Sequence, residues 1–367
     1  MTIVHLLPHF ADDGNGVVYV ATDLACAQSA AGHSVACIGG RSGSLVRLLQ
    51  DRSVVTHVLP EFKLRVFLSP RGLSRLWKLL KTLRPQIVHA HTIPAVLMAK
   101  LLQPFLGFVL VASVHNGPRL RNFLLGVGDR IICVSAAVAE GMTRLPVSSH
   151  KLRIIRNGPL GSPRRTEPAP APLKIGASNP VVMTLAGLHT YKGMQDLIEA
   201  FAIARKSIPD LSMYLLGEGP TKSQLQSLTV RLACDDRIHF EGFIKDPRPY
   251  LARADVFVLP SHQEAFGLSL AEAREAGCAV IGTNVGGIPE VLERGRCGIL
   301  VPAGNPPELG RVLVELLTDE KLLRFWKDRA LSNLSWLHVD RVFQETMEVY
   351  IELLASKPGN SARPIAT

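Results

Sequence analysis

The segment from Asp255 to Pro302 constrains most strongly what this chain can fold into. It opens with the apolar run ADVFVLP, which predicts a buried strand, and Leu270 to Ala276 has the composition and spacing of a helix. Glu264 therefore falls in the loop between strand and helix, and Glu272 falls on the helix. Ligands of open α/β sheets bind beyond the carboxyl ends of the strands, so we expect both carboxylates to face one crevice. The backbone amides expected to point into that crevice, where a nucleotide diphosphate would fit, are those of Phe266, Gly267 and Leu268.

Strand-like and helix-like segments alternate along most of the chain, which is typical of α/β domains with parallel, doubly wound sheets. A chain of 367 residues is long enough for two such domains. We expect a Rossmann-like domain over 1–160 and a second over 181–338, facing each other across a cleft that would hold the nucleotide diphosphate. Residues 161–180 are rich in Pro, Ala and Ser and predict a linker. The apolar spacing of 339–355 predicts a helix with one buried face, and 356–367 is predicted to be a disordered tail.

The composition indicates a soluble enzyme that stays in the cytoplasm. No apolar run approaches the roughly 20 residues that cross a bilayer, and the opening MTIVHLLPHF has no basic segment of the kind found in secretory signals. The six cysteines form neither a C-x-x-C pair nor a Cys/His cluster with zinc spacing, so we expect buried reduced thiols. No D-x-D triplet occurs, and we therefore expect an enzyme that needs neither metal nor cofactor.

The formal net charge of +10 is concentrated in the first half of the chain, where residues 1–173 carry 20 Lys and Arg against 8 Asp and Glu. Basic residues alternate with Leu, Phe and Trp over 61–85, a pattern that suits a helix lying on an anionic membrane. A solvated outer face of the domain would look similar, and nucleic acid is the less favoured partner. We expect peripheral association with the inner face of the plasma membrane.

Several blocks of the sequence carry a family resemblance: PQIVHAHT, DRIICVSAAVAEGM, IIRNG, LAGLHTYKGMQDLIEAFA and the two glutamates with seven residues between them. Together they resemble the retaining glycosyltransferases of family 4, group 1, which have two Rossmann-like domains (the GT-B fold) and an E-x7-E motif. The resemblance covers nearly the whole chain. It implies transfer of a hexose from a UDP- or GDP-linked sugar to a saccharide or lipid-linked acceptor of a bacterial surface polysaccharide or glycolipid. It also implies that the last helix packs back on the first domain.

Lys192, in HTYKG, is expected at the start of a helix, where its ammonium and the helix N-terminus would neutralise a departing phosphate. The family usually carries an arginine in the preceding loop, and Gly187 stands at the matching position of this donor site. Because an arginine lost from a bidentate phosphate site is not a neutral change, either His189 or a basic residue of the first domain compensates, or turnover is slow.

By resemblance, Glu264 accepts hydrogen bonds from the donor sugar near the reacting carbon, and Glu272 binds the ribose hydroxyls. A carboxylate can accept from two vicinal hydroxyls at once, which suits both roles. Glu290, in the Gly-Gly-Ile-Pro-Glu turn, is a third donor-binding candidate. Glu272 could equally be an ordinary helix-surface residue, and Glu275 offers the same chemistry.

In the first domain, Gly14 and Gly16 predict a loop in which the backbone approaches a diphosphate closely. The full G-x-G-x-x-G spacing is absent, so a nicotinamide dehydrogenase is disfavoured. His115 follows a predicted strand and resembles the family histidine that reaches the donor sugar. We interpret His89 and His91 mainly as loop-shaping residues.

The predicted chemistry is front-face retention, in which the leaving phosphate takes the acceptor's proton, because no protein nucleophile is recognisable. That mechanism follows from the resemblance. Two alternatives stay open: a nucleotide-sugar epimerase of similar architecture, and a catalytically weak scaffold subunit of a polysaccharide assembly complex, which the glycine at position 187 favours.

Overall fold

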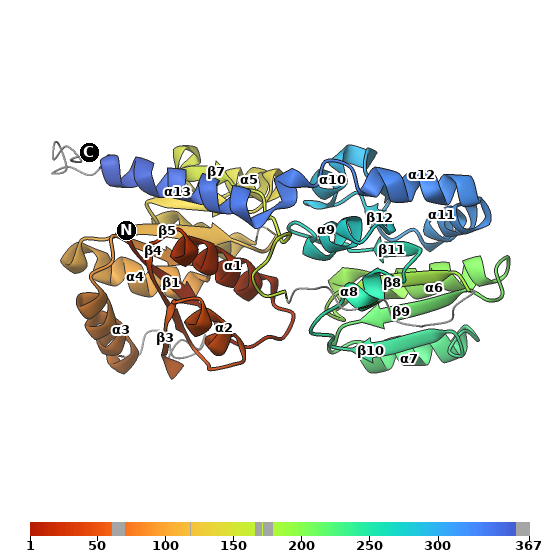
Figure 1. Cartoon of the computed structure of the whole chain (residues 1–367), viewed down its shortest axis with the longest axis horizontal. Helices are drawn as coiled ribbons and strands as arrows, with labels where there is room; N and C mark the ends of the chain where they lie inside the picture. The colour runs from red at the N-terminus through yellow and green to blue at the C-terminus, as the bar shows by residue number, and fades with distance from the viewer. Residues whose placement is uncertain (61–69, 118, 166–170, 172–178, 357–367) are drawn as a thin grey trace. The chain divides into compact units, whose positions relative to one another are not determined.

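The computed structural model describes residues 1–60, 70–117, 119–165, 171 and 179–356, which form two compact units (Figure 1). The first unit comprises 1–164 and the chain from 338 onward, and the second comprises 165–337. The boundary between Arg164 and Arg165 lies inside the segment predicted to be a linker. Most of that segment, and the predicted tail from 357, lie outside the described residues. No described helix is long and apolar enough to cross a membrane.

The first unit is built on a seven-stranded parallel sheet with the order β3-β2-β1-β4-β5-β6-β7. Its strands are β1 (Thr2–Leu7), β2 (Ser34–Gly39), β3 (Val55–Val58), β4 (Ile87–Ala90), β5 (Val109–Val114), β6 (Arg130–Cys133) and β7 (Leu152–Ile154). β5 reads VLVASV and is buried along its whole length. Such continuous apolar runs are typical of parallel strands that helices cover on both faces.

The helices of the first unit are α1 (Gly16–Ala30), α2 (Leu45–Asp51), α3 (Pro70–Leu83), α4 (Ile93–Leu106), α5 (Ala136–Thr143) and α13 (Val339–Ala355), with 3-10 turns η2 (Leu120–Val127) and η3 (Ser149–Lys151). The last helix, α13, belongs to this unit although the second unit separates it in sequence. Its Val342, Met347 and Tyr350 pack into one core with Ile3 of β1 and Ile87 of β4. α13 therefore completes the hydrophobic core of the first sheet.

The second unit repeats the same topology with six parallel strands in the order β10-β9-β8-β11-β12-β13. They are β8 (Val181–Leu185), β9 (Ser212–Leu216), β10 (Ile238–Gly242), β11 (Val256–Leu259), β12 (Ala279–Thr283) and β13 (Ile299–Val301). The helices are α6 (Met194–Arg205), α7 (Lys222–Arg231), α8 (Arg248–Leu251), α9 (Leu268–Glu275), α10 (Ile288–Val291), α11 (Pro306–Thr318) and α12 (Glu320–Ala330). Short 3-10 turns are η4 (Thr190–Lys192), η5 (Glu293–Gly295) and η6 (Ser335–Leu337).

Both sheets reverse their strand order at one point, between β1 and β4 in the first unit and between β8 and β11 in the second. Ligands of doubly wound folds bind outside the carboxyl ends of the strands at such a point. The predicted α/β architecture with two parallel, doubly wound sheets is therefore confirmed. The predicted buried thiols are also confirmed, since all six cysteines are free and buried.

Arg274 on α9 is fully buried and is the largest such side chain in the structure. Its guanidinium donates hydrogen bonds to the backbone carbonyls of Val291, Ala330 and Ser332 and to the carboxylate of Glu293. Val291 and Ala330 are the last residues of α10 and α12, where helix carbonyls lack partners inside the helix. A cation is favourable at such C-terminal ends, so this one side chain joins α9 to both helices.

We expect Arg274→Met to lower the unfolding free energy of the second unit by about 3–5 kcal/mol, because it removes the cation beside Glu293 and leaves the buried carbonyls of Val291 and Ala330 without their donor. Urea unfolding followed by tryptophan fluorescence measures this loss. In a Trp77→Phe background the remaining tryptophans, Trp326 and Trp336, both report on the second unit.

Arg311→Met is the matched control. Arg311 pairs with Glu308 and Glu315 on the surface of α11, so its removal should cost far less than the removal of Arg274. Equal losses in the two variants would show that the guanidinium of Arg274 does not hold the helices together.

Candidate functional site

Two loops at the switch point of the second sheet are fixed to each other by their backbones. The loop after β8 ends in η4, and its Tyr191 carbonyl accepts hydrogen bonds from the amides of His262 (2.9 Å) and Gln263 (3.2 Å) in the loop after β11. Gly193 has a φ of +68°, and a Cβ there would lie 2.0 Å from the carbonyl oxygen of Pro260. Only glycine allows these loops to approach so closely.

This approach brings two of the predicted catalytic residues together. The Nζ atom of Lys192 lies 2.6 Å from Oε2 of Glu264, and both side chains are largely buried, with 18% and 12% of their surface exposed. The other carboxylate oxygen of Glu264 accepts from the amide of Ala265 at 3.0 Å. The carboxyl edge of this sheet therefore carries an ammonium in contact with a carboxylate, placed by the loops after neighbouring strands.

The Gly-Gly turn supports Glu264 from the other side. The amide of Gly287 donates to the Glu264 carbonyl at 3.2 Å, and a Cβ on Gly286 would lie only 1.8 Å from that same oxygen. Glu290 lies in the first turn of α10, directly after this turn, and is partly buried. The two glycines are thus needed for the loop after β12 to pass against the loop after β11.

The start of α9 is open, as the predicted anion site requires. Gly267 is its N-cap, with a φ of +98°, and provides no side-chain cap, while Leu268 is the first helical residue. Phe266 is buried, and its ring packs edge-on against that of Trp336, with 6.2 Å between the ring centroids. This contact anchors the loop between β11 and α9. Amides at a helix N-terminus that lack a capping side chain are suited to bind an anion.

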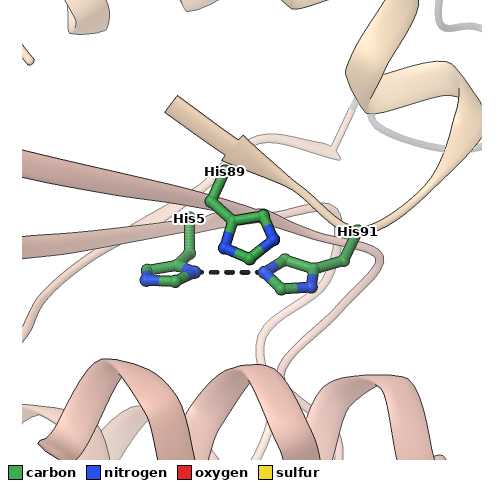
Figure 2. A group of neighbouring side chains, drawn as sticks. All are labelled: His5, His89 and His91. Carbon is green, nitrogen blue, oxygen red and sulfur yellow. Dashed lines mark hydrogen bonds between the residues drawn. The ribbon is translucent and has the colours of Figure 1, made fainter. Parts of the chain in front are cut away.

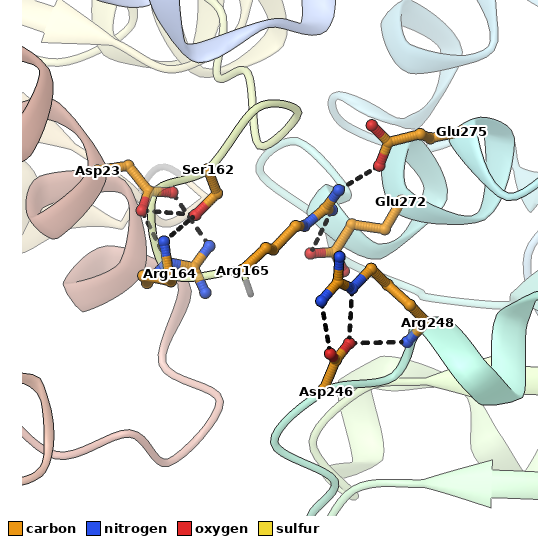
Figure 3. A network of polar contacts seen from close by, with 8 residues as sticks. All are labelled: Asp23, Ser162, Arg164, Arg165, Asp246, Arg248, Glu272 and Glu275. Carbon is orange, nitrogen blue, oxygen red and sulfur yellow. Dashed lines mark hydrogen bonds and ion pairs between the residues drawn. The ribbon is translucent and has the colours of Figure 1, made fainter. Parts of the chain in front are cut away.

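Glu272 lies one turn into α9 and is bound by a residue that the sequence analysis missed. Arg165 donates to Oε1 of Glu272 at 3.4 Å and also pairs with Glu275 on the outer side of the same helix (Figure 3). Glu272 and Glu264 therefore have different cationic partners within the second unit. The segment around Arg165 reads SPRRTEPAPAP, and nothing in that composition indicates which carboxylate an arginine there binds.

Gly187 lies where β8 has just ended, and His189 takes up the space beside it. A Cβ built on Gly187 would lie 3.2 Å from Cδ2 of His189. The imidazole also stacks on the exposed ring of Tyr191, with 5.4 Å between ring centroids. The imidazole of His189 thus lies directly beside the position that a Cβ at 187 would take.

In the first unit, the predicted glycine loop is closed by contacts of its own. Gly14 has a φ of +79°, and its amide donates to the hydroxyl of Tyr19 at 2.9 Å. Asn15 is the N-cap of α1 and accepts from the amide of Val17, and Gly16 is the first residue of that helix. Gly16 therefore starts a helix rather than extending the loop.

His115 follows β5 at the switch-point edge of the first sheet, as the sequence predicted, and it ends a buried series of hydrogen-bonded imidazoles. Nε2 of His115 lies 3.0 Å from Nδ1 of His91, and Nε2 of His91 lies 3.0 Å from Nδ1 of His5. Figure 2 shows His5, His89 and His91 grouped above the helix that covers them. Burial lowers the pKa of His5 and of His115 to about 4.

The interpretation of His89 as a loop-shaping residue is wrong, because His89 lies within β4, whereas His91 is the first residue after that strand. Both imidazoles are buried, with pKa values that burial holds well below 6.5. His89 contacts the hydroxyl of Tyr350 on α13 (2.6 Å) and that of Ser113 on β5 (2.7 Å). The sequence signal for this arrangement was the polar residues at matched positions of adjacent parallel strands, where His5 pairs in register with His89.

Comparison with known proteins agrees with this architecture. Residues 14–158 match the family model of Glycosyltransferase Family 4, and residues 179–319 match that of glycosyl transferases group 1. The lipopolysaccharide core biosynthesis glycosyltransferase LpsE of Rhizobium meliloti is 29% identical over 272 residues, which cover 72% of this chain and 77% of that protein. A glycogen synthase of Mycobacterium tuberculosis is 27% identical over 318 residues, covering 78% of this chain and 72% of that protein.

Among solved structures, HepE of Anabaena in complex with UDP and glucose superposes with a TM-score of 0.82 and 21% identity, covering 97% of this chain and all of that one. WaaG, a glycosyltransferase involved in lipopolysaccharide biosynthesis, gives a TM-score of 0.75 at 16% identity over 95% of this chain and 99% of that one. These likenesses show the GT-B fold.

The buried histidines predict that acid destabilises the first unit selectively. The unfolded chain binds protons near pH 6.5, whereas folded His5 and His115 resist protonation down to about pH 4. Because the unfolded state binds more protons in this window, the free energy of unfolding decreases as the pH falls through it. We expect a loss of about 2 kcal/mol per histidine by pH 5.

Urea unfolding at pH 7.5 and pH 5 measures this loss, with Trp77 as the only tryptophan for the first unit and Trp326 with Trp336 for the second. The second unit is the control, because its described histidines, at 189, 239 and 262, are not buried. An equal loss in both units would contradict the assignment to the buried imidazoles.

Proposed function

Because the chain belongs to the group 1 glycosyltransferases of family 4, with their two-domain GT-B fold, we propose that it transfers a hexose from a nucleoside-diphosphate sugar to a saccharide or lipid-linked acceptor. The donor is UDP- or GDP-linked. The product would be part of a bacterial surface polysaccharide or glycolipid, a proposal supported by the relationship to LpsE. That HepE was solved with UDP supports a nucleotide donor.

The contact between Lys192 and Glu264 is the observation that carries this proposal. A glycosyl donor needs a cation at its diphosphate and a hydrogen-bond acceptor at its sugar hydroxyls, and here the two groups lie 2.6 Å apart at the switch point. Lys192, together with the uncapped N-terminus of α9, would neutralise the leaving diphosphate. Glu264 would then exchange its ammonium partner for sugar hydroxyls, and Glu272 would bind the ribose.

We propose retention of the anomeric configuration without a metal ion. The bond between the anomeric carbon and the phosphate oxygen breaks, and the acceptor hydroxyl attacks from the same face. The acceptor's proton passes to the departing phosphate oxygen while a bond forms between the acceptor oxygen and the anomeric carbon. Lys192 supplies the positive charge at the phosphate that a metal ion provides in other enzymes.

A scaffold role is the second candidate, and Gly187 is the observation that favours it. The arginine that the family carries there is missing, and the imidazole of His189 fills the space beside the glycine. An imidazole provides less charge for a phosphate than a guanidinium does. Binding of a nucleotide and turnover of its sugar distinguish an enzyme from a scaffold.

The first test is a thermal-shift panel with UDP, GDP, ADP, CMP and dTDP, with and without EDTA. We expect one diphosphate to raise the melting temperature, with EDTA making no difference, because a ligand at about 100 times its dissociation constant stabilises a protein by about 2.7 kcal/mol. Glu272→Gln should weaken that nucleotide's binding by about tenfold or more, since it removes the ionised acceptor of the ribose hydroxyls.

Glu275→Gln is the matched control, because Glu275 lies on the same helix and binds the same Arg165 but is exposed. Its affinity for the nucleotide should stay near that of the natural protein. No shift with any nucleotide would favour the scaffold. With the matching nucleotide sugar, NMR of the product decides the stereochemistry, and an inverted anomer would overturn the proposed mechanism.

We also propose that α3 docks on an anionic membrane at the cytoplasmic face, where a lipid-linked acceptor would be available. Residues 61–69 of the predicted basic segment lie outside the described residues, and α3 provides the rest. Its Leu76 and Leu80 are buried, while its basic side chains are exposed; these are Arg71, Arg75, Lys78 and Lys81. Beside them, Trp77 contacts Phe105 of α4, which is 72% exposed. Exposed aromatic rings beside a basic face are suited to bind anionic headgroups.

Sedimentation with vesicles of phosphatidylglycerol and phosphatidylcholine tests this surface. Replacing the four exposed basic residues of α3 by Gln should weaken binding by about 10²–10³-fold at low salt, since each contributes about 1 kcal/mol near an anionic surface.

The control removes the same charge from exposed residues of the second unit, namely Lys206, Arg231, Lys321 and Arg324. If both quadruple variants lose the same affinity, the attraction depends on net charge rather than on α3. If the natural protein stays unbound at low salt, docking through α3 is wrong.

A further inference from the structure

The imidazoles of His5, His91 and His115, here called the imidazole series, form one continuous line of hydrogen bonds in the first unit. The series begins at Gln28, whose Oε1 lies 2.7 Å from Nε2 of His5. It then runs through His5 and His91, with 3.0 Å at each step, to His115. A neutral imidazole has one nitrogen that donates and one that accepts. The tautomer of any one member therefore fixes the tautomers of all the others.

Gln28 is fully buried and can fix that direction, because its two amide atoms have different surroundings. Its Nε2 lies 3.8 Å from the sulfur of Met347, a weak acceptor with no hydrogen to give. With Nε2 directed at Met347 of α13, Oε1 faces His5 and can only accept. His5 must then carry its proton on Nε2.

We propose that Gln28 is a positioning residue that sets the tautomer of His115, so that His115 offers an unprotonated Nδ1 to a hydroxyl of the bound saccharide. With His5 protonated at Nε2, its Nδ1 accepts from Nε2 of His91, and Nδ1 of His91 accepts from Nε2 of His115. The Nε2 proton of His115 is thereby donated to His91, and the free lone pair of His115 is on Nδ1. This inference rests on the proposed function only for the identity of the hydroxyl.

The position of Nδ1 in His115 agrees with this role. It makes no hydrogen bond to the part of the chain that the structure describes, and it is not one of the fully buried polar atoms that lack a partner. Nδ1 therefore reaches the surface at the carboxyl end of β5. Because burial keeps the pKa of His115 near 4, the imidazole is neutral at pH 7 and the lone pair is available.

A metal ion is the competing explanation, because nitrogens of His5, His89 and His91 lie within 4.8 Å of one another. Ligand lone pairs lie in the plane of an imidazole, so a shared ion must lie near all three ring planes. The rings of His89 and His91 are instead stacked, at 4.3 Å and 30°. This stacking and the hydrogen bonds at both nitrogens of each ring favour neutral imidazoles over a metal centre.

Long-range ¹H–¹⁵N NMR of the full chain labelled with ¹⁵N-histidine tests the tautomers without any ligand, and His115→Gln assigns the His115 signals. At pH 7 we expect His115 to be neutral and protonated at Nε2 only. In Gln28→Met the acceptor is gone, and His115 should show a mixture of both tautomers although three hydrogen bonds separate it from residue 28.

Tyr350→Phe is the matched control, since it removes a buried hydroxyl that is bound to His89 but leaves the contacts of Gln28 with His5 and Met347 in place. We expect His115 to keep its Nε2 proton in this variant. This measurement still tests the proposal if Gln28→Met does not fold. An Nδ1-protonated or charged His115 in the natural protein would overturn the proposal. So would a bound metal ion in the purified protein, or a tautomer that Gln28→Met leaves unchanged in a folded protein.

Turnover then tests the use of the lone pair. If half or more of the molecules hold the wrong tautomer, kcat/KM of Gln28→Met should fall by about two- to fivefold, in proportion to the competent fraction. Tyr350→Phe should stay near the natural value. A changed tautomer with unchanged kcat/KM would show that His115 does not accept from the substrate. A failure of the proposed function would appear separately, as no turnover of any nucleotide sugar by the natural protein.

Discussion

The buried guanidinium of Arg274 is the interaction on which the second unit depends most. It satisfies carbonyls at the ends of α10 and α12 and pairs with Glu293, which also accepts from the indole of Trp336. Arg274 thereby anchors the second turn of α9 to these helices. This contact fixes the position of Glu272, which lies on α9, and of the Glu264 loop, which leads into it. A buried arginine is unfavourable unless every donor finds a partner, so the surrounding helices must end where they do. The stability of this region and the geometry of the site therefore have one cause.

Close backbone contact is the second constraint on the site. Three glycines let the loops after β8, β11 and β12 pass at distances that a side chain would block: Gly193 against Pro260, Gly286 against Glu264 and Gly287 against Ala265. These contacts bring the loops together before any charged group interacts. The ion pair between Lys192 and Glu264 is thus a consequence of backbone packing, and its two side chains are free to separate when a substrate provides other partners.

The fold was predictable because strand and helix periodicity, the Gly-rich turns and the apolar strands depend on local sequence. The placement of Lys192 and Glu264 on loops after strands followed from the same reasoning, since parallel strands end at one edge. Arg165, Arg274 and Gln28 were not predictable in their roles. Their partners lie far away in sequence, on α9, on the ends of α10 and α12, and on β1, so only the folded chain shows what each side chain binds. His89 was misread for the same reason, because strand register and not local sequence joins it to His5.

The polar side chains at the two switch points are stabilised in different ways, as an ion pair in the second unit and as neutral imidazoles in the first. At the second sheet, charges of opposite sign meet near the surface, where an ammonium and a carboxylate can each exchange one partner for another without being left unpaired. At the first sheet, four imidazoles lie close together. Hydrogen bonding in a single direction satisfies His5, His91 and His115 as neutral groups, and His89 is bound by Tyr350 and Ser113. Neutral imidazoles cannot neutralise the charge of a phosphate, but their hydrogen bonds can hold the lone pair of His115 in one orientation. In the function proposed here, binding of charge and orientation of a hydroxyl therefore fall to separate units.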